Sequence, residues 1–198
     1  MLLLASMLGT SLVIPSQALG ESTIQAKFSY KGDVFADAQV ATFGSANGQG
    51  TVSFRAAYES TDKFLYVQFE VTAETTVNSD DYLTLFLDLN NEKSTIPDSN
   101  DWYFFLDRIG RIGDGQYVVG TGWTSTANYP LWVYSWLSTS TSWEVVMAIQ
   151  ITINDGQTLG IMVQQGDASL MRYVNYPSGS SIYNPSTWDA LVVSKRDS

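Results

Sequence analysis

Apolar residues recur at every second position along two stretches of the sequence. In residues 142–153 (SWEVVMAIQITI) one face would carry Trp143, Val145, Met147, Ile149, Ile151 and Ile153. In residues 82–90 one face would carry Leu83, Leu85, Leu87 and Leu89. A period of two is that of a β-strand with one buried face. No convincing helical period of 3.6 occurs elsewhere, so the alternation favours an all-β fold.

Shorter stretches with the same character follow one another along the chain. They cover residues 24–30, 50–58, 64–71, 102–109, 116–120, 131–136, 159–164 and 188–193, with Gly, Asn, Asp and Ser between them. Many short strands separated by turns are typical of an antiparallel β-sandwich of the jelly-roll or immunoglobulin-like kind. We find no internal repeat and no long linker, and therefore expect residues 19–198 to form a single domain.

The N-terminus resembles an export signal. Residues 1–22 begin with an apolar run and then reach Ser16-Gln17-Ala18, a small-x-small pattern, which predicts a signal peptide over residues 1–18. The usual Lys or Arg before the apolar run is missing, and a buried N-terminal helix is the alternative. No other segment approaches the roughly 20 apolar residues that a membrane span needs. We expect a secreted or cell-surface protein that is soluble outside the cytoplasm.

Composition removes several classes of function. The chain contains neither Cys nor His, which excludes disulfides, thiol nucleophiles and nearly all zinc sites. An exported chain without Cys favours a bacterial or archaeal origin. The net charge of -10 argues against nucleic acid as a partner. No carboxylate pair stands in a recognised catalytic motif, so we do not expect an enzyme; Glu70 and Glu144 would be the first to test.

An acidic loop, residues 88–101, joins two apolar stretches. Its candidate metal ligands are Asp88, Asn90, Glu92, Asp98 and Asp101. If the flanking strands pair as a hairpin, these oxygens converge, and Ca²⁺ takes six to eight oxygen ligands. The spacing is not that of an EF-hand, because Lys93 and Ser99 occupy the places of its Gly and Glu. The alternative is that Asp and Asn only stabilise turns; Asp80 and Asp81 could contribute from a neighbouring loop.

Aromatic residues gather in residues 120–136 (GTGWTSTANYPLWVYSW). The candidate carbohydrate-binding residues are Trp102, Trp123, Tyr129, Trp132, Tyr134 and Trp136, with Arg108 for hydroxyl groups. Trp132, Tyr134 and Trp136 would share one face of a strand. Flat rings flanked by polar groups match the apolar faces and hydroxyl rims of sugars. The alternative is that the rings close the core.

Five segments carry a family resemblance. LYVQFEV, DYLTLFLDLNNEKSTIPDSNDWYFFLDRIG, TSWEVVMAIQITI, LGIMVQQ and YNPSTWDALVVS resemble, in this order, carbohydrate-binding-module family 9-like domains of the DOMON-like group over residues 58–194. The resemblance implies a secreted sandwich that binds sugar between aromatic rings without chemistry of its own, often with supporting Ca²⁺. Asp88, Asn90 and Asn91 match the family's F-L-D-x-N-N segment. Trp143 and Glu144 match a strand signature, whereas Gln150 stands where the family often has Pro.

Two further interpretations remain open. The chain could be an assembly subunit of a surface layer, matrix or filament, in which residues 22–44 pair with a neighbour's sheet. The other interpretation is a haem-binding protein, because some DOMON-like relatives bind haem. Without His, its iron would need Met147, Met162 or Met171 together with a Lys.

Overall fold

The computed structural model describes residues 23–28, 34–36, 38–73, 78–125 and 128–194. They form thirteen strands and one short 3-10 helix, η1 (Pro185–Thr187). The strands are β1 (Thr23–Phe28), β2 (Val40–Gly44), β3 (Thr51–Glu59), β4 (Phe64–Val71), β5 (Tyr82–Asp88), β6 (Asp101–Asp107), β7 (Ile112–Val118), β8 (Gly122–Thr124), β9 (Trp132–Ser138), β10 (Trp143–Gln150), β11 (Thr158–Asp167), β12 (Arg172–Tyr176) and β13 (Asp189–Ser194).

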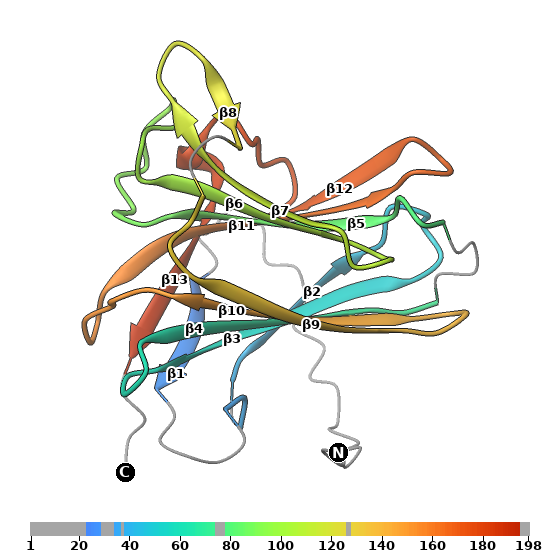
Figure 1. The fold of residues 1–198 in the computed structure, drawn as a ribbon, viewed down its shortest axis with the longest axis horizontal. Helices are drawn as coiled ribbons and strands as arrows, with labels where there is room; N and C mark the ends of the chain where they lie inside the picture. Colours follow the sequence, from blue (N-terminus) through green and yellow to red (C-terminus); the bar gives the residue numbers. More distant parts are fainter. Residues whose placement is uncertain (1–22, 29–33, 37, 74–77, 126–127, 195–198) are drawn as a thin grey trace.

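The strands fold into two facing layers. Their hydrogen-bonded order is β8-β7-β6-β5-β11-β13-β1-β3-β4-β10-β9, with β12 added to β11 and β2 to β3. Figure 1 shows β5–β8, β11 and β12 as the upper layer, and β2–β4, β9 and β10 as the lower layer. This arrangement confirms the predicted all-β antiparallel sandwich. The sequence did not indicate that β1 runs parallel to both β13 and β3, which connects the two layers at one side.

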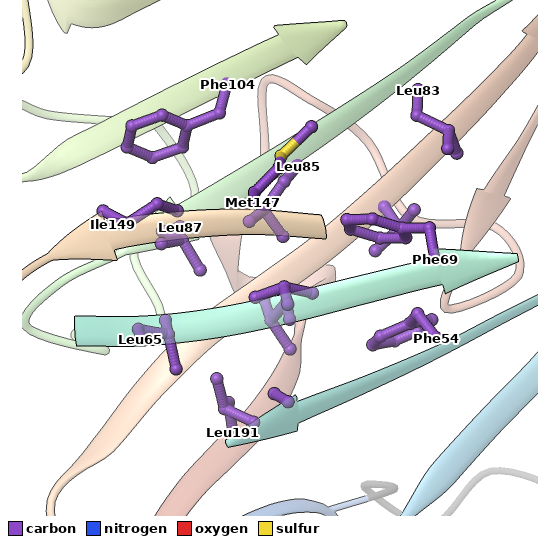
Figure 2. Packing of buried hydrophobic residues seen from close by; sticks show 14 of the residues in the cluster. Phe54, Leu65, Phe69, Leu83, Leu85, Leu87, Phe104, Met147, Ile149 and Leu191 are labelled. Carbon is purple, nitrogen blue, oxygen red and sulfur yellow. The ribbon is translucent and has the colours of Figure 1, made fainter. Parts of the chain in front are cut away.

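The core lies between the two layers. It includes the apolar residues that alternate along residues 82–90 and 142–153, as predicted from the sequence. Leu83, Leu85 and Leu87 of β5 are fully buried, and on β10 so are Val145, Met147 and Ile149. Figure 2 shows several of these side chains packed with Phe54, Phe69 and Phe104 from facing strands. β10 ends at Gln150, earlier than predicted, but Ile153 still reaches the core.

Three strands, β2, β8 and β12, were not predicted from the sequence, because their residues do not alternate clearly between buried and exposed positions. β2 and β12 each have five residues, β8 has three, and all three attach to a single neighbouring strand among the described residues. A short strand with one partner can be partly exposed on both faces, so no clear alternation is imposed on it. β12 nevertheless matters, because it extends the upper layer beyond β11 (Figure 1).

A second apolar cluster lies on the outer face of the upper layer. It contains Phe86, Met162 and Trp188, with Tyr103 and Trp123 against them. Phe86 is flanked in β5 by the inward-facing Leu85 and Leu87, so it points outward. Residues 180–188, which we call the rim segment, bring Ile182 and Trp188 onto this face.

The structure describes only part of the N-terminal region. The predicted signal peptide, residues 1–18, lies outside the described residues. β1 and β2, from the segment that could pair with a neighbour's sheet in the assembly interpretation, also pair with strands of the chain's own sheet. Over the described residues, no helix has the length and apolar character needed to cross a membrane.

Candidate functional site

A cavity of about 400 Å³ opens on the outer face of the upper layer. Strands β5, β11 and β12 and the rim segment supply its walls, which are Tyr82, Gln164, Tyr173, Asn175, Ser180, Ser181, Ile182 and Tyr183. Tyr173 and Tyr183 remain 62% and 60% exposed, although tyrosine rings are usually better covered. Two exposed rings beside one cavity form a surface suited to the flat face of a ligand.

A chain of hydrogen bonds forms the polar part of the cavity. The Tyr82 hydroxyl donates to Gln164 Oε1 (3.2 Å), and Gln164 Nε2 donates to Asn175 Oδ1 (3.1 Å). Asn175 Nδ2 in turn donates to the carbonyl of Ser180 (2.8 Å), whose buried Oγ has no partner among the described residues. The described lining residues include no Asp, Glu, Lys or Arg. Burial, followed by the neighbouring Tyr173, raises the pKa of the Tyr82 hydroxyl. The wall therefore offers hydroxyl and amide groups to a neutral polar ligand.

Gly166 permits the position of the Tyr82 ring. A Cβ at Gly166 would lie 2.1 Å from Tyr82 Cε1, so the ring rests directly on this glycine. Strand pairing sets the contact, since Gly166 of β11 lies opposite Tyr82 of β5. The other neighbour is Phe105, at a ring-centroid distance of 5.6 Å. Tyr82 is thus held between two strands before any ligand binds.

Two indole groups hold the rim segment in place. Trp188 Nε1 donates to the carbonyl of Ser181 (2.7 Å), and Trp123 Nε1 donates to the carbonyl of Ile182 (3.2 Å). The backbone N–H of Ser181 also donates to Thr187 Oγ1 (3.0 Å). Trp123, a candidate sugar-binding residue from the sequence, therefore supports the cavity wall from behind.

Most of the other aromatic candidates pack toward the interior. Trp102 is 9% exposed, and Tyr129 meets it edge to face at 4.9 Å. Trp132 packs on Phe104 at 5.5 Å and donates through Nε1 to Asp114 Oδ1 (3.0 Å). These contacts are those of the alternative in which aromatic rings close the sandwich core.

Trp132, Tyr134 and Trp136 share one face of β9, and that face turns inward. Their positions oppose Ile149, Met147 and Val145 of β10, whose side chains are in the core. Adjacent rings along this row lie 5.9 and 5.7 Å apart. Trp136, at the open edge, is 43% exposed and is the most accessible of the candidates.

Arg108 is a structural residue rather than a surface donor. It is 3% exposed, and its Nη1 lies 3.6 Å from Oδ2 of the buried Asp81. Its Nη2 donates to the carbonyl of Thr139 (2.9 Å) and its Nε donates to Ser138 Oγ (3.1 Å), which ties the upper layer to the end of β9.

The acidic loop closes a hairpin, as expected, and brings two carboxylates together. Asp88 and Asp101 lie opposite each other on β5 and β6, 0% and 1% exposed. Asp88 Oδ1 accepts from the N–H groups of Asn90 (3.1 Å) and Asn91 (2.6 Å), and Asp101 Oδ2 accepts from that of Asp98 (2.6 Å). Asp88 Oδ2, Asp101 Oδ1 and Asn91 Oδ1 are buried without a hydrogen-bond partner among the described residues.

Burial raises the pKa of both carboxyls. For Asp101 the pKa rises to about 7, mainly through burial, with Asp88, Asp98 and Glu92 adding repulsion against one backbone hydrogen bond. Burial also raises the pKa of Asp88, against hydrogen bonds from backbone N–H groups. Two buried carboxylates with free oxygens are costly unless a proton or a cation neutralises them.

The remaining metal candidates stay on the surface. Asn90 and Glu92 are exposed, and Asn90 Nδ2 donates to Glu92 Oε2 (3.2 Å). Asp98 Oδ1 accepts from the N–H of Asn100 (2.6 Å), as in the turn-stabilising alternative. Within the described residues, no three acidic side chains converge closely enough to hold an ion by themselves. The structure thus unites Asp88 and Asp101 but not the five predicted ligands.

The acidic loop also contacts the rim segment. Lys93 Nζ donates to the carbonyl of Trp188, and the N–H of Ser186 donates to the carbonyl of Ser94 (2.9 Å). Lys93 has a φ of 54°, a left-handed conformation that residues other than Gly seldom adopt. The carboxylate pair and the cavity wall are therefore connected through a few hydrogen bonds.

Comparison with known proteins identifies the fold. No family profile and no curated protein matches the sequence. Among solved structures, a carbohydrate-binding module of family 9 from Caldicellulosiruptor kristjanssonii in complex with glucose aligns with a TM-score of 0.70 and 18% identity, over 89% of this chain and 97% of that one. The fold is similar to that of a family 9 carbohydrate-binding module.

Two further structures agree with this family 9-like fold. The Caldicellulosiruptor module in complex with cellotriose gives the same TM-score and identity, over 89% of this chain and 95% of that one. A candidate carbohydrate-binding protein from Bacteroides uniformis aligns with a TM-score of 0.59 and 15% identity, over 86% and 98% of the two chains. The predicted resemblance to family 9-like domains is confirmed at the level of the fold.

Sequence reasoning missed the cavity residues Tyr82, Gln164, Tyr173, Asn175 and Tyr183. Tyr82 was visible as an outward position of an alternating strand, but outward tyrosines are common. Gln164 and Asn175 lie opposite each other because β11 pairs with β12, and Tyr82 joins them because β11 also pairs with β5. Tyr183 reaches the cavity through the rim segment, whose course no periodic pattern reveals.

Proposed function

We propose that this protein is a non-catalytic carbohydrate-binding domain whose sugar site is the cavity between Tyr173 and Tyr183. The observation that carries the proposal is the pairing of these two exposed rings with the uncharged amide and hydroxyl groups of Gln164 and Asn175. Sugars stack their C–H faces on aromatic rings and direct their hydroxyl groups to such polar partners. The structural neighbours in complex with glucose and cellotriose support neutral β-glucan fragments as first ligands to test.

The direct test compares two sets of exposed rings. Binding of glucose and cello-oligosaccharides is measured by calorimetry for the wild type and for Tyr173→Ala, Tyr183→Ala and Trp136→Ala. We expect each tyrosine variant to lose at least tenfold in affinity, consistent with roughly 1–3 kcal/mol for a stacked ring, and Trp136→Ala to bind normally. If only Trp136→Ala lost sugar affinity, the sugar site would instead be the row of aromatic residues on β9. No binding across a glycan array would reject the carbohydrate function.

We also propose a structural Ca²⁺ between Asp88 and Asp101. Three buried oxygens without partners, Asp88 Oδ2, Asp101 Oδ1 and Asn91 Oδ1, support it. Gly160 lets the Asp88 side chain pack directly against β11, since a Cβ there would lie 2.8 Å from Asp88 Cβ. Two carboxylates with amide, carbonyl and water oxygens suit Ca²⁺, which needs no all-carboxylate cage. The ion would neutralise the pair and stabilise the acidic loop.

The placement of the two strand glutamates is consistent with a binding role. Glu70 and Glu144 lie opposite each other on β4 and β10, next to Gln68, which donates to Glu144. Glycosidases instead place two carboxyl groups on either side of the bond to be cleaved. A secreted or cell-surface location, as the N-terminal sequence predicts, would bring such a domain to polysaccharides.

A further inference from the structure

One long segment of the sequence is free of charged residues although the protein is strongly acidic. Between Asp114 and Glu144 the sequence contains no Asp, Glu, Lys or Arg, whereas the whole chain has a net charge of -10. This neutral stretch, residues 115–143, contains β8 and β9. These are the two ends of the strand order, so each forms an edge of the sheet among the described residues.

β9 has the features of an edge strand that can accept another strand. It pairs with β10 without interruption from Trp132 to Ser138, and no strand of the described chain covers its other edge. Its seven residues include no charge, Pro or Gly, which are the residues that natural proteins use to block edge pairing. Every second backbone group of such an edge points outward without a partner.

Exposed apolar side chains surround this edge. On the outward face of β9, Val133 and Leu137 are 51% and 63% exposed, and Leu131 just before the strand is 41% exposed. Trp136 on the other face is 43% exposed. Apolar groups at an unpaired edge indicate an interaction surface more strongly than scattered surface residues do.

We propose that β9 pairs antiparallel with β9 of a second copy of this chain, forming a two-fold symmetric dimer. The distribution of charge favours a second copy of this chain over a basic partner. β9 itself offers a basic partner no counter-charge, and two chains of charge -10 repel each other less along this strand than along a strand that carries carboxylates. The nearest carboxylate on this face is Glu144 of β10, opposite Leu137, and it accepts a hydrogen bond from Gln68. A two-fold axis beside the free edge of β9 pairs the strand with its own copy, so that the edge is its own complement.

The dimer would leave the cavity open. β9 belongs to the lower layer (Figure 1). The cavity is lined by residues of β5, β11, β12 and the rim segment, which belong to the upper layer. A dimer therefore presents two cavities, and two linked sites bind a polysaccharide more tightly than one. The dimer itself does not depend on the carbohydrate function.

The first test is the mass in solution, measured by sedimentation velocity over a range of protein concentrations. We expect the wild type to approach twice the chain mass of 21.8 kDa, and to do so more readily as salt screens the repulsion. Leu137→Lys and Val133→Lys should be monomeric. Ile96→Lys is the matched control, because Ile96 is as exposed as Leu137 at 63% but lies in the acidic loop; it should remain dimeric.

The second test uses the absence of cysteine from the chain. Single Val133→Cys, Ser135→Cys and Leu137→Cys variants are oxidised, and we expect the position nearest the two-fold axis to cross-link efficiently, with Ser99→Cys remaining uncross-linked. A wild type that stays monomeric at the highest concentrations would overturn the proposal. So would a dimer that survives both lysine substitutions, or one that Ile96→Lys also dissociates. Circular dichroism confirms that each variant is folded.

Discussion

At the scale of single residues, Gly166 is the most specific test of how the cavity is built. In Gly166→Ala the new methyl group would collide with the Tyr82 ring, from which it would be 2.1 Å away. We expect a loss of about 1–3 kcal/mol in the free energy of unfolding and at least a tenfold loss of sugar affinity as Tyr82 moves. Chemical denaturation and calorimetry measure the two effects.

Gly113→Ala is the control for this substitution. Gly113 also lies in a strand of the upper layer, but a Cβ there has no neighbour within 4 Å. Its effect on both measurements should be small. Equal losses of sugar affinity in the two variants would show that the ring contact at Gly166 is not what organises the cavity.

The burial of single residues could be predicted from the sequence more readily than the roles of their side chains. The burial of Leu83, Leu85 and Leu87 was predictable, because alternation alone assigns each residue to a face. The roles of Trp123 and Arg108 were not, because a ring or guanidinium group can serve a ligand or the fold equally well. Only its contacts decide: Trp123 bonds the carbonyl of Ile182, and Arg108 lies beside the buried Asp81.

At the scale of elements, the contact between the acidic loop and the rim segment should transmit metal binding to the sugar site. Lys93 reaches the carbonyl of Trp188, while the Trp188 indole holds Ser181 of the cavity wall. We predict that Ca²⁺ tightens sugar binding in the wild type, and that Lys93→Met reduces this effect several-fold, within the 1–3 kcal/mol typical of coupling between sites. Calorimetric titrations of sugar with and without Ca²⁺ measure it.

Lys93→Arg, which keeps a cationic donor, is the matched variant and should retain most of the coupling. Ca²⁺ binding itself is followed separately by calorimetry, so that a lost ion is distinguished from a lost connection. If both Lys93 variants respond to Ca²⁺ as the wild type does, the contact carries no coupling.

Among the elements, pairing between neighbouring strands was predictable from the sequence, whereas pairing between distant strands was not. The hairpin that joins Asp88 to Asp101 could be expected, because its two strands are adjacent in the sequence and strongly patterned. The cavity could not, because it requires β11 to lie between β5 and β12 and a rim segment without periodicity to fold over them. The parallel position of β1 likewise depends on long-range pairing.

At the scale of the whole molecule, stability should depend on pH through the buried carboxylates. In the unfolded chain Asp101 has its ordinary pKa of 3.8, whereas in the fold burial raises its pKa to about 7. Between these values the unfolded state binds fewer protons, so the free energy of unfolding falls as pH rises. At 1.36 kcal/mol per pKa unit the penalty above pH 7 is at most about 4 kcal/mol, and Asp88 changes in the same direction.

The measurement is urea unfolding between pH 5 and 7.5, once with a chelator and once with Ca²⁺. With chelator, the wild type should lose stability toward pH 7.5, and Asp101→Asn should lose less, because only Asp88 of the buried pair can then lose a proton. Ca²⁺ should restore stability to the wild type at pH 7.5, because the ion replaces the proton between Asp88 and Asp101, and should help the variant less. A wild type that gains stability toward pH 7.5 in the chelator would mean that this carboxylate pair is already neutralised by other means.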